Sequence, residues 1–110
     1  MSFFDSELVQ DEMEDIYDLQ SDIYVGIQRF TAMSREEKIN HINTLSTLLD
    51  KQQILYTRLS LSNDPEAMKM KEQIQEVTSI LGFGKADMNV IFNSMKKTIE
   101  SLKKTVHIDT

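Results

Sequence analysis

The feature of the sequence that most constrains its fold is a regular apolar pattern along residues 9–30. The positions recur in alternating steps of four and three residues, with one polar member, Gln20. Because this spacing returns to one side of an α-helix every seven residues, it predicts a long helix over about residues 6–30 with a coiled-coil-like seam. The predicted seam consists of Val9, Met13, Ile16, Gln20, Ile23, Ile27 and Phe30.

Three more helical segments are predicted over about residues 35–60, 65–81 and 86–106, where apolar residues keep a helical spacing. The joints between segments are short, so consecutive helices should be antiparallel neighbours. The sequence therefore predicts an all-α fold. We expect an antiparallel helical bundle or extended helical hairpin of about four helices, in a single domain spanning residues 1–110.

The helix ends carry their own signals. Ser34 stands three residues before Glu37, the spacing of a capping box, in which each side chain binds a free backbone amide of the other residue. Asp64 is expected to cap the third segment, with Pro65 at its first position, where a missing amide hydrogen costs nothing. Gly82 is expected to stop the same segment.

Composition excludes several classes of protein. The chain has no Cys, which rules out disulfides and Cys-based zinc sites and suits a reducing cytoplasm. No apolar run approaches the ~20 residues that span a bilayer, and the acidic N-terminal stretch does not resemble a signal peptide. We therefore expect a cytoplasmic protein that does not insert into membranes. The net charge of -6 disfavours binding to a nucleic-acid backbone.

Catalytic and metal-binding motifs are missing from the sequence. Di-metal helical bundles use Glu three residues before His, but Lys38 and Lys104 stand three residues before His41 and His107. The chain has neither a phosphate-binding loop nor a nucleophile motif. We expect no catalytic residue, no metal and no cofactor.

Four aspartates form a stripe on the first predicted helix: Asp11, Asp15, Asp18 and Asp22. Each follows a predicted seam position by two residues, which places it about 200° around the helix, at ~100° per residue. Asp is a weak helix former, so a run of it suggests a purpose beyond helicity. Three interpretations are open: a solvated face, a docking surface for a basic protein partner, or a mimic of the nucleic-acid backbone.

Tyr17 and Tyr24, seven residues apart, are expected to lie beside this stripe. They either flank the seam or serve as aromatic anchors at a protein interface, where such residues are enriched. The candidate partner-binding residues are therefore the four aspartates and these two tyrosines.

Self-association is a further expectation. The first two helices are longer than the last two, so part of their seam should lack a partner within one chain. A homodimer would cover it. Our functional hypothesis is a non-enzymatic protein–protein interaction or regulatory module. The alternative is a nucleic-acid-associated factor or acidic nucleic-acid mimic.

Three stretches of the chain resemble a small uncharacterised all-helical family of cyanobacteria and cyanophages: FFDSELVQDEMEDIYDLQ, LLDKQQILYTRLSLSND and LGFGKADMNVIFNSM. The resemblance implies a compact, cytoplasmic helical protein of about this length. It supplies no activity, cofactor or site residue.

Overall fold

The computed structural model describes residues 2–83 and 87–108, and helices account for nearly all of them. The described residues contain no strand, so the predicted all-α fold is confirmed. In chain order the elements are the short η1 (Phe3–Asp5), α1 (Glu7–Arg29), the short η2 (Phe30–Ala32), α2 (Arg35–Leu61), α3 (Pro65–Thr78), η3 (Ser79–Phe83) and α4 (Met88–Ile108). The predicted start of the last helix at Ala86 lies outside the described residues.

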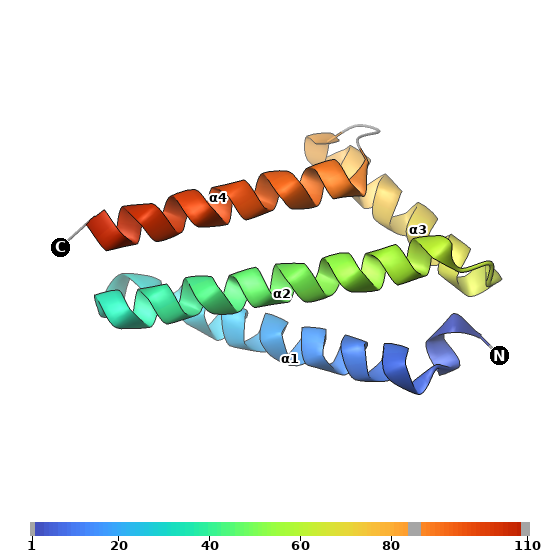
Figure 1. The fold of residues 1–110 in the computed structure, drawn as a ribbon, viewed down its shortest axis with the longest axis horizontal. Helices are drawn as coiled ribbons and strands as arrows, with labels where there is room; N and C mark the ends of the chain where they lie inside the picture. The colour runs from blue at the N-terminus through green and yellow to red at the C-terminus, as the bar shows by residue number, and fades with distance from the viewer. Residues whose placement is uncertain (1, 84–86, 109–110) are drawn as a thin grey trace.

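Helix α2 occupies the middle of the molecule, with α1 along one side and α4 along the other (Figure 1). Both neighbours run antiparallel to α2, and α3 crosses at the end where α2 finishes. Helices α1 and α4 pack extensively against α2, and contact between α1 and α4 themselves is slight at most. The molecule is therefore a flat layer, with principal dimensions of 51 × 31 × 19 Å.

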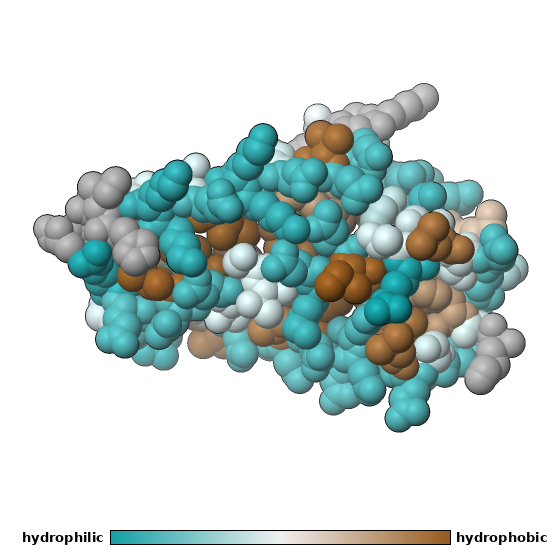
Figure 2. Space-filling view, in the orientation of Figure 1, coloured by the Kyte–Doolittle hydropathy of each residue, from teal (hydrophilic) through white to brown (hydrophobic). Residues whose placement is uncertain are grey.

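Two apolar clusters hold α2 to its neighbours. Ile16 and Ile23 of α1 pack with Leu48 of α2, and Leu45 contacts both clusters. The larger cluster joins α2 to α4, and it consists of Ile42, Leu49, Met88, Ile91, Phe92 and Ile99. Figure 2 shows one broad face of the molecule, where hydrophilic side chains predominate and hydrophobic ones gather mainly between the helices.

The helix ends agree with most of the predicted signals. Ser34 Oγ accepts a hydrogen bond from the Glu37 amide at 3.1 Å, and the Ser34 amide donates to the Glu37 carboxylate at 3.4 Å. Pro65 is the first residue of α3, and Gly82 has a φ of 96°, the left-handed conformation that glycine adopts readily. Asp64 precedes α3 but makes no side-chain cap. Its carboxylate instead accepts the Phe3 amide at 3.1 Å, which holds η1 beside α3.

The α1 seam is correct at every second position and wrong at the others. Val9, Ile16 and Ile23 are buried as predicted, but Met13 and Ile27 are exposed. The positions that face α2 in alternation with these three residues are Glu12, Leu19 and Gly26, each one residue earlier than predicted. Glu12 faces α2 because its carboxylate pairs with Arg58, with 3.0 Å between Oε1 and Nε.

Gly26 lets α1 approach the start of α2 closely, because a Cβ at this position would collide with the His41 ring. We expect Gly26→Ala to destabilise the native chain by about 1–2 kcal/mol, since the collision outweighs the better helix propensity of alanine. In a His41→Ala background the same change should stabilise by up to about 1 kcal/mol. Urea denaturation of the four proteins measures this coupling, and equal effects in both backgrounds would exclude the close approach.

Candidate functional site: an uncharged groove between α1 and α4

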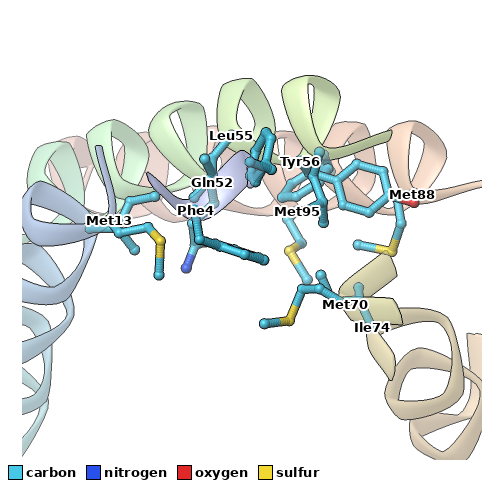
Figure 3. A pocket seen from close by; sticks show the side chains of 13 residues that line it. Phe4, Met13, Gln52, Leu55, Tyr56, Met70, Ile74, Met88 and Met95 are labelled. Atoms are coloured by element: carbon cyan, nitrogen blue, oxygen red, sulfur yellow. The ribbon is translucent and has the colours of Figure 1, made fainter. Parts of the chain in front are cut away.

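Because α1 and α4 flank α2 without covering it, an apolar cavity of about 360 Å³ remains between them, open to solvent on one side. Met13 reaches it from α1, Met70 and Ile74 from α3, and Met95 from α4 (Figure 3). Phe4 of η1 also lines the cavity. The remaining lining residues are Phe3, Ile16, Gln52, Leu55, Tyr56, Leu59, Met88 and Phe92.

A second stripe continues along α1 from this cavity. It consists of Met13, Tyr17, Gln20, Tyr24 and Ile27, again in steps of four and three residues. We call it the groove stripe, since Met13 lines the cavity and the others follow on the same side of the helix. Tyr17, Tyr24 and Ile27 are exposed by 71%, 67% and 62%. A heptad-spaced apolar stripe thus faces solvent instead of another helix of the chain.

The opposite wall of the groove comes from α4. Met95 lines the cavity, and Leu102 lies seven residues further along the same side of the helix. Their side chains are exposed by 41% and 46%. Large apolar side chains are thus exposed on α4 as well as on α1.

Charged residues are missing from both walls. Over an arc of about 120° at ~100° per residue, the groove side of α1 also carries Gln10, Ser21 and Gln28, none of them charged. The corresponding arc of α4 carries, besides its apolar residues, only hydroxyl side chains: Ser94, Thr98, Ser101 and Thr105. We refer to the groove stripe, Gln52, Met95, Thr98 and Leu102 together as the uncharged face.

The ion pairs between helices lie on the other side of the layer. Lys51 Nζ is 3.4 Å from Asp15 Oδ2, and Lys96 Nζ is 3.2 Å from Asp50 Oδ1. Together with the Arg58–Glu12 pair, these ion pairs join α2 to α1 and α4. On α2, the charged residues of the three pairs lie on a different side of the helix from the cavity residue Gln52. The molecule thus separates a charged face from an uncharged one.

The structure places the aspartate stripe on the charged side. All four aspartates are exposed, and Asp15 is paired with Lys51. Because the buried seam of α1 is shifted, the aspartates are opposite the groove stripe, about 170° around the helix, and not opposite the buried seam. One of the predicted site residues, Asp15, therefore has a partner within the chain.

The two tyrosines do not lie beside the aspartates as expected. Tyr17 and Tyr24 follow Met13 on the groove side of α1, about 140° from the mean direction of the aspartate stripe at ~100° per residue. The expectation was wrong because the spacing of these residues along one helix, and not the position of the seam, determines the angle between them. The candidate site therefore divides into an acidic outer face and two tyrosines at the groove.

Among the described residues that line the cavity, Tyr56 is the one with a titratable side chain. Burial raises the pKa of the Tyr56 hydroxyl above its ordinary value of 10.0, the Asp87 carboxylate raises this pKa further, and a hydrogen bond with Gln75 lowers it. The hydroxyl therefore stays protonated at neutral pH and can serve as a hydrogen-bond donor. It is poorly suited to act as a general base.

Residues 2–83 and 87–108 contain no cluster of three or more His, Asp or Glu side chains placed to hold a metal ion. Nor does this part of the chain contain a helix of sufficient length and apolarity to cross a membrane.

Sequence reasoning did not find the groove itself. It assigned Met13, Gln20 and Ile27 to the buried seam, whereas they belong to an exposed stripe that includes both tyrosines. One signal in the sequence could have revealed it. The flank of α1 that includes these residues carries no charge, while the other flank carries four aspartates.

No curated protein and no solved structure matches the chain significantly. A family model does match it, over residues 1–106, and it is described as a domain of unknown function (DUF1825). The chain, with its flat all-α layer and uncharged groove, belongs to the DUF1825 family.

Proposed function

We propose that this protein is a non-enzymatic interaction module that binds another protein chain through the uncharged face. The observation that carries the proposal is the groove stripe of α1, which keeps heptad spacing while facing solvent beside an apolar cavity. Helices with this spacing pack against other helices.

The composition of the uncharged face supports a protein partner. The buried centres of protein interfaces are enriched in Tyr and Met and depleted of Lys, Glu and Asp. Four methionines line the cavity, Met13, Met70, Met88 and Met95, and flexible thioethers adapt well to apolar surfaces of different shape. Leaving such side chains in water forgoes roughly 25 cal/mol per Å² of apolar surface. A bound chain would recover this free energy.

The same face disfavours a nucleic acid as the partner, because it offers no cation to a phosphate backbone. Docking of a basic protein on the aspartate stripe stays a prediction, as does mimicry of a nucleic acid by the same residues. The geometry adds no further support to either interpretation of the aspartate stripe, because these aspartates are simply exposed to solvent.

We place this activity in the cytoplasm and expect it to need no metal or cofactor, as the absence of Cys suggests. A cyanobacterial or cyanophage setting, suggested by the resemblance in the sequence, belongs to the same proposal.

The test uses a photo-crosslinking amino acid placed at Tyr24 on the groove side, with a matched substitution at Asp22 on the same helix as the control. We expect irradiation in cells to join another polypeptide to the chain from position 24 and little from position 22. Adducts from position 22 alone would indicate that the aspartates, and not the uncharged face, form the binding surface. If neither position gives an adduct, the interaction module itself is refuted.

A further inference from the structure

We infer that the occupant of the uncharged face is a second copy of this chain, bound through a two-fold symmetric interface. The inference rests on the proposed function and specifies its partner. Three features argue for it: the distribution of charge, the size of the face, and the spacing of the groove stripe.

The charge distribution permits a second copy at this face and disfavours one at the acidic side. A two-fold interface brings the same patch of both chains together, so a patch rich in one charge repels itself. Two copies with a net charge of -6 each repel overall. The uncharged face is the side on which this repulsion is weakest, because the aspartates of α1 point the opposite way. In the dimer the two aspartate stripes would lie on its outer surfaces, far from each other.

The side of the molecule that includes the uncharged face has room for a dimer interface. The broad side of the molecule measures 51 by 31 Å. A stable interface buries about 800 Å² on each partner, less than this side offers. The chain is also only 19 Å thick, so a second layer would turn an open sheet of helices into a two-layer bundle with a covered core.

The spacing of the groove stripe determines which elements meet. Its steps of four and three residues suit packing of helix against helix, so α1 of one copy would lie in the groove of the other. The groove stripe of the inserted α1 would then face two helices of the other copy. These are its α1 and the apolar residues Met95 and Leu102 of its α4. Gln20 is at the centre of the stripe, so it would lie near the two-fold axis and meet its own counterpart.

The experiment exploits the lack of Cys in the natural sequence. In Gln20→Cys and the control Asp18→Cys, the introduced thiol is the only one in the chain. Both positions are exposed on α1, so both variants should fold. We expect Gln20→Cys to form a disulfide-linked dimer at least about tenfold faster under oxidation than Asp18→Cys, since its two thiols approach within disulfide reach.

Light scattering on the native chain completes the test. We expect a particle of twice the 12.8 kDa chain mass at micromolar concentration. A monomer at high micromolar concentration overturns the inference, and so does a dimer whose Asp18→Cys variant cross-links faster than Gln20→Cys. If the chain is monomeric and position 24 still gives photo-adducts with a different protein, self-pairing fails while the proposed function stands. Without adducts of any kind, both fail.

Discussion

Ile23→Asp should unfold the chain, whereas Ile27→Asp, four residues later on the same helix, should leave it folded. Ile23 is 8% exposed and packs with Ile16 and Leu48, so an aspartate there would place a charge in the contact between α1 and α2. An unpaired buried charge costs several kcal/mol, comparable with the total stability of a small domain. Ile27 is 62% exposed, and an aspartate there stays in water.

Circular dichroism and urea denaturation measure both effects. We expect Ile23→Asp to lose most of its helical signal at 25 °C, and we expect Ile27→Asp to keep it, with a free energy of monomer unfolding within about 0.5 kcal/mol of native. The conservative Ile23→Val serves as a control and should cost about 0.5–1.5 kcal/mol. Equal losses from the two aspartate variants would restore the seam predicted from sequence and contradict the observed packing of α1.

Replacing Tyr17 and Tyr24 together by Glu should weaken binding at the uncharged face by about 100-fold or more. Each tyrosine offers a large exposed aromatic surface, and buried tyrosines are frequent among the residues that dominate binding energy. A loss of 1.4 kcal/mol corresponds to tenfold in affinity. In a two-fold dimer every substitution acts twice, and four carboxylates would enter an apolar interface, so the total should exceed 100-fold.

Sedimentation over a range of concentrations measures this dissociation constant, and the urea-unfolding midpoint of the dissociated monomer should change little. Asp18→Asn with Asp22→Asn is the matched control on the same helix, and it should leave the affinity within about threefold of native. Because the face is uncharged while the two chains repel through their net charge, native affinity should rise modestly and not fall between low and physiological salt. A steep loss of affinity with salt, or a loss confined to the aspartate variant, would indicate that the acidic side is the binding surface.

Much of the fold follows from local physical chemistry. The order and type of the helices could be predicted because the signals that determine them are local. These signals are the helical spacing of apolar residues, the Ser34 capping box, Pro65 and Gly82. The rotation of α1 could not be predicted in this way. It depends on Arg58, which lies far along the chain and pairs with Glu12, and on the fit of Gly26 against His41.

The groove was even harder to predict from the sequence than the rotation of α1. An exposed heptad-spaced stripe and a buried one have the same periodicity, so Met13 and Ile27 look like core residues until the number of packed neighbours is known. The tertiary arrangement decides it, because α3 crosses at the end of α2 (Figure 1) and an apolar cavity stays open where α1, α2, α3 and α4 meet. One feature of the site can be read from the sequence: one flank of α1 carries no charged residue.

We propose that α1 uses one side for folding and a second, uncharged side for binding. Methyl NMR of methionine-labelled protein tests it most directly, because Met13 and Met95 line the groove whereas Met68, 54% exposed, does not line it. On dilution from the associated to the dissociated state, or on addition of a partner captured from position 24, the Met13 and Met95 methyl signals should shift and the Met68 signal should not. A shift of Met68 with unmoved Met13 and Met95 signals would contradict the account.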